Sequence, residues 1–265
     1  MTYTFFALER EDGLLWVWLN RPEKRNFLNL SFWEELPLLV EEIALDKCVK
    51  VVCLAAKGSS FSMGLDISEF ALKFSELFFG ESAAHRQQIL ELIEKLQKGI
   101  KSLLGLEKPV LACVHRHCIG GGLDLIAACD IRLCSRDAIF SLKESELHIV
   151  ADMGSLQLLP YIIGEARTRE LAFTGRDISS EEALQMGLVN RVFEDKESMW
   201  QEARKLGLEM AKKDPLVLKG IKAVLNERRN YVVNSSLRHV ALWNSAFLQN
   251  ESFLALIEKW GKRKS

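Results

Sequence analysis

The sequence predicts an α/β fold in which two strands and a helix repeat along the chain, followed by a region that is helical throughout. Apolar runs and turn residues over residues 4–55 give the order strand, strand, helix, strand. A strand, a glycine turn and a buried helix follow over residues 109–128. From residue 197 onward the apolar residues recur with the helical period. We therefore expect a core over residues 1–195 and a helical region over residues 196–265.

Two short strands open the chain. Residues 4–8 and 14–19 are apolar runs of strand length, separated by the turn residues Glu11, Asp12 and Gly13. This pattern is typical of a β-hairpin.

The first helix is marked by its capping signature. Ser31 is followed three positions later by Glu34, which predicts a helix start there and a helix that continues to about Leu45. Residues 49–55 then form a continuous apolar run of strand length.

A polar, glycine-containing turn follows this strand. It spans residues 57–66, KGSSFSMGLD, and leads into a second helical pattern. Residues 69–85 are rich in phenylalanine, which predicts packing in the core, with Gly80 between two helical pieces. Residues 86–104 are amphipathic with the helical period.

The glycine turn lies at the centre of the sequence. Gly120, Gly121 and Gly122 follow the apolar run 109–114 and precede the stretch LDLIAACD. Glycine allows close approach of the backbone to a ligand, and the free N–H groups at a helix start attract negative charge. We therefore expect this turn to stabilise a developing anion.

Three carboxylates accompany the turn. Asp124 follows the glycines directly, Glu144 lies twenty positions further on, and Asp152 lies eight beyond that. The neighbours of Asp152, including Ile149 and Met153, are apolar, so these acids are not ordinary surface charges. They are the candidate catalytic residues.

The remaining elements are mostly helical. Residues 165–173 read as a helix, Ser179 with Glu182 caps a second one, and residues 188–193 read as a last strand. The many large apolar residues after position 197 predict packing against another subunit.

The central stretch, residues 118–154, resembles the enoyl-CoA hydratase/isomerase (crotonase) superfamily, and more narrowly its Δ3,5-Δ2,4-dienoyl-CoA isomerases. In that branch the glycine turn is followed by Asp, and a Glu and a second Asp follow at these spacings. The resemblance extends over most of the chain, through the motifs LNRPEKRN, FSMGLD, KPVLACV and GLVNRVF.

The resemblance implies a crotonase-like spiral of ββα repeats with a C-terminal helical trimerisation region. It also implies that the backbone N–H groups of Leu65 and Gly121 form an oxyanion hole for the thioester oxygen. The implied substrate- and CoA-binding residues are Ser62, Met63, Gly64, Leu65, Asp66 and Gly121. For the phenylalanine-rich residues 69–85, the resemblance offers an alternative to core packing, namely an acyl-chain pocket wall or a mobile flap.

The implied reaction converts a 3,5-dienoyl-CoA into a 2,4-dienoyl-CoA. Glu144 takes the proton beside the carbonyl, Asp152 supplies a proton four bonds away, and Asp124 modulates the pair. A positioned acid or base must lie within roughly 3 Å of its proton, so one carboxylate does not easily serve both ends. Glu144 and Asp152 therefore start in opposite protonation states, and apolar neighbours raise the pKa of Asp152.

Two other functions stay open. A 2-enoyl-CoA hydratase needs two carboxylates on one water, but Asp124 is one carbon shorter than the usual hydratase Glu, and Asp152 then has no role. A non-catalytic binding or scaffold protein of the same fold is the second. The sequence has no basic patch with interleaved aromatics, which argues against RNA binding, and it retains all three acids, which argues against lost catalysis.

Three residues depart from the family pattern. Arg116 and His117 replace a glycine-containing pair before the turn, and His148 stands where relatives nearly always have Gly. We consider two roles for His148: a tolerated loop residue, or an imidazole near the acyl pocket that changes substrate choice.

Composition excludes several other classes. The net charge of −1 lacks the excess of Lys and Arg that nucleic-acid or membrane-surface binding requires. The six cysteines lie in apolar surroundings without a C-x-x-C pair, so we expect reduced core residues. His115 and His117 are two apart, but no further ligand cluster supports a metal site.

We expect an acyl-CoA thioester as substrate and no separate cofactor, because coenzyme A is part of that substrate. The expected assembly is a homotrimer or a dimer of trimers, without nucleic acid or membrane partners, and the expected location is cytoplasmic. The basic ending, Lys259, Lys262, Arg263 and Lys264, is interpreted as a solvated tail, with contact to the CoA phosphates as the alternative.

Overall fold

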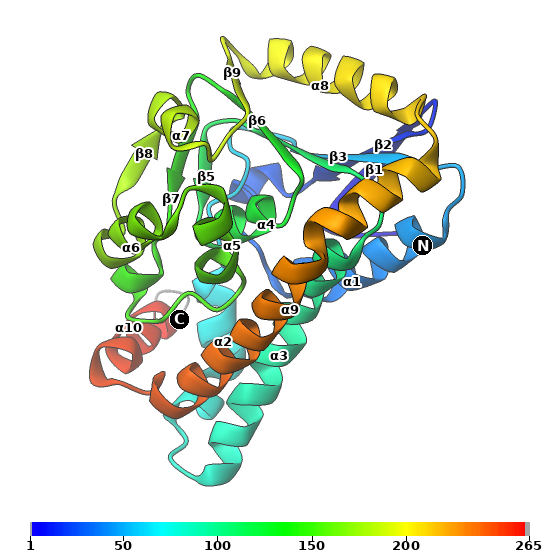
Figure 1. Ribbon diagram of the computed structural model, residues 1–265. Helices are drawn as coiled ribbons and strands as arrows, with labels where there is room; N and C mark the ends of the chain where they lie inside the picture. The colour runs from blue at the N-terminus through cyan, green and yellow to red at the C-terminus, as the bar shows by residue number, and fades with distance from the viewer. Residues whose placement is uncertain (1, 263–265) are drawn as a thin grey trace.

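The computed structural model describes residues 2–262, and Arg263 and Lys264 of the basic ending lie outside this range. Two sheets and their covering helices form the α/β architecture (Figure 1). The strands are β1 (Phe6–Glu11), β2 (Leu14–Leu19), β3 (Val51–Ala56), β4 (Val110–Val114), β5 (His117–Ile119), β6 (Ile131–Ser135), β7 (Ile139–Ser141), β8 (Asp177–Ser179) and β9 (Arg191–Phe193). The α-helices are α1 (Leu30–Leu45), α2 (Ile67–Phe79), α3 (Ala83–Gly105), α4 (Gly121–Ala127), α5 (Ser155–Ile162), α6 (Glu165–Thr174), α7 (Ser180–Met186), α8 (Lys196–Ala211), α9 (Pro215–Phe247) and α10 (Glu251–Gly261). Short 3₁₀ helices are η1 (Pro22–Lys24) and η2 (Glu144–Leu147).

Two successive strand pairs, β4 with β5 and β6 with β7, contribute one strand to each of two sheets. The larger sheet has the order β1-β2-β3-β4-β6-β9, and only its β1–β2 pair is antiparallel. The smaller sheet has the order β5-β7-β8. Thus β4 and β5 are followed by α4, and β6 and β7 by η2 and α5. This is the predicted two-strand-plus-helix repeat.

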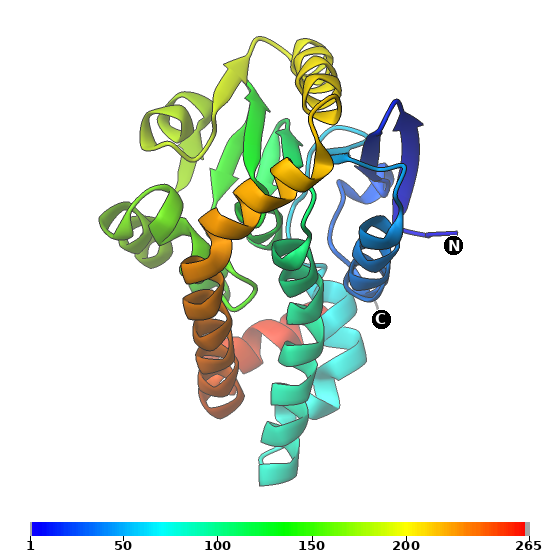
Figure 2. The same ribbon diagram turned by 45° about the vertical axis from the view of Figure 1, so that its right-hand side comes forward.

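The larger sheet is covered on both faces, so its central strands are continuous apolar runs rather than alternating ones. Along β2, Trp16 and Trp18 pack in a smaller core with Met199 of α8, whereas Val17 packs in the main core with Phe32 of α1. Figure 2 shows α8 at one end of the molecule and the long helices α3 and α9 descending beside each other.

The C-terminal helices return to the middle of the molecule. Helix α9 packs against α3 and α5, and α10 packs against α2. The ammonium group of Lys222 in α9 donates to Asp130 Oδ2 at 2.7 Å and to the Lys108 carbonyl at 2.9 Å. These contacts hold the N-terminal part of α9, whereas its C-terminal part, at Asn244, reaches the cavity described below.

Several local boundaries differ from the sequence predictions. The first helix is capped by Asn29, whose side chain accepts from Phe32 N, and not by Ser31. Strand β1 begins two residues later than predicted and extends to Glu11, because it pairs with all of β2. Cys48 is exposed, whereas the other five cysteines are buried as expected. Ser179 caps α7 as predicted.

Candidate active site

Two backbone turns meet at the edge of the main cavity. One contains Gly64, which has φ +83°, and the other is the glycine turn before α4. A Cβ at Gly64 would lie 2.8 Å from the Ile119 carbonyl oxygen and 3.6 Å from Gly121 N, so glycine is required for this approach. The N–H groups of Leu65 and Gly121 make no hydrogen bond within residues 2–262, and both residues line the cavity. This leaves two backbone donors available to one acceptor.

Of the residues next to Leu65 in sequence, some line the cavity and others support the turn from behind. Met63 and Gly64 line the cavity with Leu65. Ser62 is fully buried; its hydroxyl donates to the Asn26 carbonyl and accepts from Gly64 N. Asp66 caps α2 and pairs with Arg21 at 2.7 Å. Among the described lining residues, Ser62 and Asp66 do not appear, and their contacts support the turn instead.

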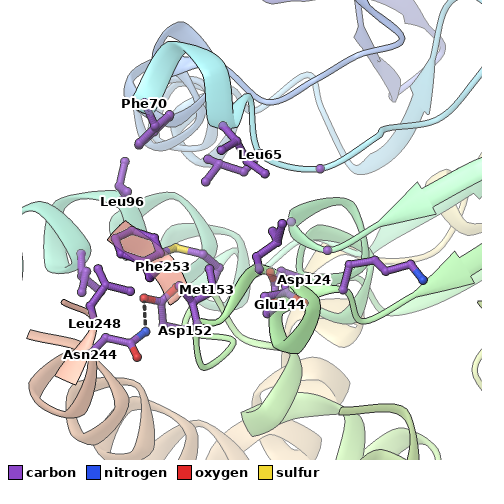
Figure 3. Close-up of a pocket in the computed structure, with 18 of the residues that line it drawn as sticks. Leu65, Phe70, Leu96, Asp124, Glu144, Asp152, Met153, Asn244, Leu248 and Phe253 are labelled. Atoms are coloured by element: carbon purple, nitrogen blue, oxygen red, sulfur yellow. Dashed lines mark hydrogen bonds between the residues drawn. The ribbon is translucent and has the colours of Figure 1, made fainter. Parts of the chain in front are cut away.

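All three predicted acids line this cavity. Asp124 comes from α4, Glu144 begins η2, and Asp152 lies in the loop before α5. In Figure 3, Asp124 and Glu144 lie together, whereas Asp152 lies nearer Met153, Leu248 and Phe253. The fold therefore brings together three acids that the sequence spreads over 29 residues.

Asp124 is held by the start of α5. Its Oδ1 accepts from both the backbone N and the Oγ of Ser155, each at 2.6 Å. Burial raises the pKa of Asp124 to about 6, and the two bonds from Ser155 act in the opposite direction.

Glu144 is the acid with the poorest hydrogen bonding. Its Oε2 is buried and has no partner among the described residues. Gly120, at φ +48°, lies against it, and a Cβ there would be 3.1 Å from Glu144 Oε1. Burial, followed by the charges of Asp124 and Asp152, raises the pKa of Glu144 well above its ordinary value.

Asp152 has one side-chain donor. Asn244 Nδ2 in α9 donates to Asp152 Oδ2 at 2.8 Å (Figure 3). Burial raises the pKa of Asp152 to about 7, in the direction expected from its apolar neighbours, and the bond from Asn244 acts to lower it. Burial raises the pKa of Glu144 as well, and the expectation that Glu144 and Asp152 start in opposite protonation states stays a prediction.

The cavity has a volume of about 290 Å³ and an apolar wall. Helices α2, α3 and α10 contribute most of that wall, including Phe70, Leu96 and Phe253. Part of the phenylalanine-rich segment thus forms a pocket wall as well as core: Phe78 is buried and also lines the cavity. An apolar chain attached to a polar head fits this shape.

Asn244 escaped the sequence analysis. It lies within the largely apolar run VALWNSAFL, residues 240–248. A polar residue in such a run is the one sequence feature that could have indicated a buried functional amide. Its link to Asp152 joins positions 92 residues apart, which no local pattern reveals.

The three residues that depart from the family pattern, Arg116, His117 and His148, are not among the described residues that line the cavity. Arg116 has φ +55° and His148 φ +61°, the left-handed region in which glycine is favoured. Both side chains are exposed, and His148 is not among the described lining residues. His117 is half-buried and its Nδ1 contacts Ser60 Oγ at 3.1 Å. The interpretation of His148 as an acyl-pocket residue is therefore wrong, because its side chain faces solvent.

Comparison with known proteins agrees with the fold and the motifs. The family model for enoyl-CoA hydratase/isomerase matches residues 9–259. The chain belongs to the enoyl-CoA hydratase/isomerase family. The mitochondrial Delta(3,5)-Delta(2,4)-dienoyl-CoA isomerase of Mus musculus is 38% identical over 249 residues, covering 94% of this chain and 76% of the mouse protein. The peroxisomal protein of the same name from Arabidopsis thaliana is 40% identical over 231 residues, covering 87% and 83%.

Other members of the family are more distant. A crotonyl-CoA hydratase of Syntrophomonas wolfei is 32% identical over 228 residues, covering 86% of this chain and 83% of that protein. The crystal structure of an enoyl-CoA hydratase from Bacillus halodurans superposes with a TM-score of 0.86 at 22% identity, covering 97% and 100%. These matches confirm the crotonase-type fold, and the dienoyl-CoA isomerase relatives confirm the predicted isomerase-type enzyme. Within residues 2–262, no helix combines the length and hydrophobicity needed to cross a membrane.

Proposed function

We propose that the enzyme converts 3,5-dienoyl-CoA thioesters into 2,4-dienoyl-CoA thioesters. The observation that carries this proposal is the distribution of acids in one apolar cavity: Glu144 lies beside Asp124, and Asp152 lies toward the apolar end (Figure 3). Two acids at separate places suit a reaction that removes a proton at one carbon and adds one at another. The similarity to named dienoyl-CoA isomerases supports it.

Binding rests on the two free backbone donors. The thioester oxygen accepts from the N–H groups of Leu65 and Gly121, between walls formed by Met63 and Gly64, and the acyl chain occupies the apolar cavity. Preorganised donors of this kind stabilise the negative charge that develops on the oxygen. Coenzyme A enters as part of the substrate, so no separate cofactor is needed.

The first proton step belongs to Glu144. Its carboxylate takes the proton from the carbon beside the carbonyl, and the electron pair of that C–H bond moves into the thioester. This gives a trienolate, an enolate conjugated with the two double bonds of the substrate, whose charge is shared by the carbonyl oxygen. The proximity of Asp124, whose charge raises the pKa of Glu144, makes Glu144 a stronger base once it is ionised. Asp124 itself stays fixed by Ser155 and acts through its charge.

The second proton step belongs to Asp152. The protonated acid donates to the carbon four bonds away, at the far end of the trienolate. An electron pair of the trienolate forms the new C–H bond there, and the remaining double bonds shift to give the 2,4-diene. The substrate has lost one proton and gained another, so product and substrate are isomers. Glu144 ends protonated and Asp152 ends ionised, and exchange with water restores the starting state.

A hydratase is the competing function, and one relative carries that name. Ultraviolet spectra separate the two, because isomerisation of 3,5-octadienoyl-CoA extends conjugation with the thioester, whereas hydration of 2-octenoyl-CoA destroys it. We expect the first change and not the second. Hydration of octenoyl-CoA without isomerisation of the dienoyl ester would overturn the proposal.

Two substitutions test the assignment of one proton-transfer step to Glu144 and the other to Asp152. Asp152→Asn should abolish isomerisation while exchange of the thioester-adjacent proton with deuterated water remains measurable, and Glu144→Gln should remove both. Asp46→Asn, the same chemical change at a surface carboxylate paired with Arg10, serves as the control. Wild-type isomerisation by Asp152→Asn would show that the two-acid scheme is wrong.

We also propose that the enzyme is a homotrimer or a dimer of trimers. Helix α9 exposes a row of large apolar side chains that a second copy would cover. They are Leu216, Val217, Ile221, Val224 and Leu225. The relatives are named as mitochondrial and peroxisomal proteins, and the cytoplasmic location of this chain stays a prediction.

A further inference from the structure

Asn244 is a buried amide whose NH₂ group points at the loop that carries Asp152. Its side chain is 2% exposed, and Figure 3 shows the amide directed from α9 toward Asp152. Nδ2 donates to the carbonyl oxygen of Val150 and to Asp152 Oδ2, each at 2.8 Å. Both hydrogens of the amide are therefore used within one loop.

The Val150 carbonyl determines which way the amide faces. A backbone carbonyl only accepts hydrogen bonds, so the NH₂ group, and not the amide oxygen, must be turned toward it. The same NH₂ group then presents its second hydrogen to Asp152 Oδ2. The orientation of Asn244 is thus independent of whether Asp152 is protonated.

This contact distinguishes the two oxygens of Asp152. Since Oδ2 faces a donor in either protonation state, the ionisable proton belongs on Oδ1. We propose that Asn244 is a positioning residue for proton donation: it holds Asp152 so that Oδ1 carries the proton to the distant carbon, and it stabilises the carboxylate that remains. This inference rests on the proposed dienoyl-CoA isomerase function.

A second helix fixes the backbone of the same acid. Gln97 Nε2 in α3 donates to the Asp152 carbonyl oxygen at 2.8 Å and to the Leu237 carbonyl at 3.0 Å. Gln97 therefore links the backbone of the Asp152 loop to helices α3 and α9, and it does not contact the carboxyl group of Asp152. Among residues 2–262, Asn244 is the side chain that donates to that carboxyl.

The charge change during donation explains why the bond matters for the rate. As Asp152 loses its proton, negative charge appears on its oxygens, and a hydrogen bond to a charged acceptor is stronger than one to a neutral acceptor. The other ionisable groups facing the cavity are Asp124 on α4 and the run Lys143, Glu144 and Glu146 at η2; the described lining residues of α3, α9 and α10 are uncharged. Burial and the charge of Asp124 oppose ionisation of Asp152, and the hydrogen bond from Asn244 offsets part of their effect.

The test replaces the donor and keeps its surroundings. Asn244→Leu fills a similar volume without an N–H group, and Asn244→Ala removes the amide and leaves a smaller side chain. Ser245→Ala is the control: it removes a buried hydroxyl on the same helix that donates to the Leu242 carbonyl. In both Asn244 variants we expect kcat for dienoyl-CoA isomerisation to fall about 10- to 100-fold, the effect of losing a hydrogen bond to a charged group. Exchange of the thioester-adjacent proton, which needs only Glu144, should stay within about two-fold of wild type.

The pH profile separates positioning from damage to the fold. Because the bond from Asn244 lowers the pKa of Asp152, its loss should move the alkaline limb of the isomerisation profile to higher pH. Ser245→Ala should change neither the limb nor the two rates. Parallel loss of exchange and isomerisation, an unmoved alkaline limb, or loss of binding to saturated octanoyl-CoA in both Asn244 variants would assign Asn244 to the fold and overturn the proposal. Failure of the wild-type protein to isomerise dienoyl-CoA would instead overturn the proposed function.

Discussion

Replacing Asp152 with Asn should stabilise the fold while it removes the reaction. The pKa of Asp152 is raised by burial from its ordinary value of 3.8 to about 7, so the folded protein holds this proton over a range in which the unfolded chain has lost it. The free energy of unfolding therefore falls as the pH rises from about 4 to about 7. Asparagine carries no charge, and its amide oxygen can still accept from Asn244.

The size of the effect follows from the width of that range. A pKa difference of about three units, at about 1.4 kcal/mol per unit, corresponds to about 4 kcal/mol. Above pH 7, Asp152 therefore lowers the free energy of unfolding by about this amount relative to pH 4. The variant should match wild type near pH 4 and exceed it by about this amount at pH 8. For a chain of this size, the gain corresponds to about 8 °C in Tm.

Thermal and urea unfolding of both proteins from pH 4 to pH 8 measures this difference. Asp46→Asn is the matched control: a hydrogen bond from Cys48 N, followed by one from Arg10, lowers the pKa of Asp46, so its loss should not stabilise the protein at high pH. A gain for Asp152→Asn that is the same at pH 4 and pH 8 would refute the reasoning, because it would have a source other than ionisation.

Three further measurements test the site and the assembly. Gly120→Ala places a Cβ 3.1 Å from Glu144 Oε1 at a φ of +48°, so strain of about 1–3 kcal/mol should displace the base and lower kcat/KM; wild-type turnover would contradict this. Phe253→Ala enlarges the apolar end of the cavity and should shift the kcat/KM ratio toward longer acyl chains, and an unchanged ratio would place the chain end elsewhere. Sedimentation at micromolar concentration should show a trimer or hexamer, and a stable monomer would argue against the proposed role of the exposed face of α9.

Local signals in the sequence predicted the elements that local interactions determine. Leu14–Leu19 and the cap at Ser179 appear as predicted, because apolar runs and capping side chains act within a few residues. Ser31, with Glu34 three positions later, predicts a cap for α1, but Asn29 is also a good capping residue and is the one that caps the helix. Two competing caps within one turn are not resolved by propensity alone.

The acids of the site were predictable and their partners were not. Asp124, Glu144 and Asp152 stand out because a charged residue in apolar sequence demands an explanation. Asn244 and Gln97 reach Asp152 from helices 92 and 55 residues away, so their contacts exist only once α9 and α3 have packed together. Arg116 and His148 stand where the family pattern has glycine, and both have the positive φ that glycine favours. Their side chains are exposed and do not line the cavity.

The hydrogen bonds of the acids also bear on the direction of proton flow. Burial raises the pKa of both Glu144 and Asp152, but Asp152 accepts a bond from Asn244, whereas Glu144 Oε2 has no partner among the described residues. When the pair holds one proton, these contacts favour its position on Glu144, which is the distribution that one forward turnover leaves behind. Proton transfer toward Glu144 and away from Asp152 is thus assisted by the site, and return of the proton through water becomes a separate step. Because the contacts of the free site favour this same distribution, the first conversion and each later one both require the proton to return to Asp152 through water. Single-turnover and steady-state measurements should therefore show solvent isotope effects of similar size, and an effect on steady-state turnover alone would contradict this argument.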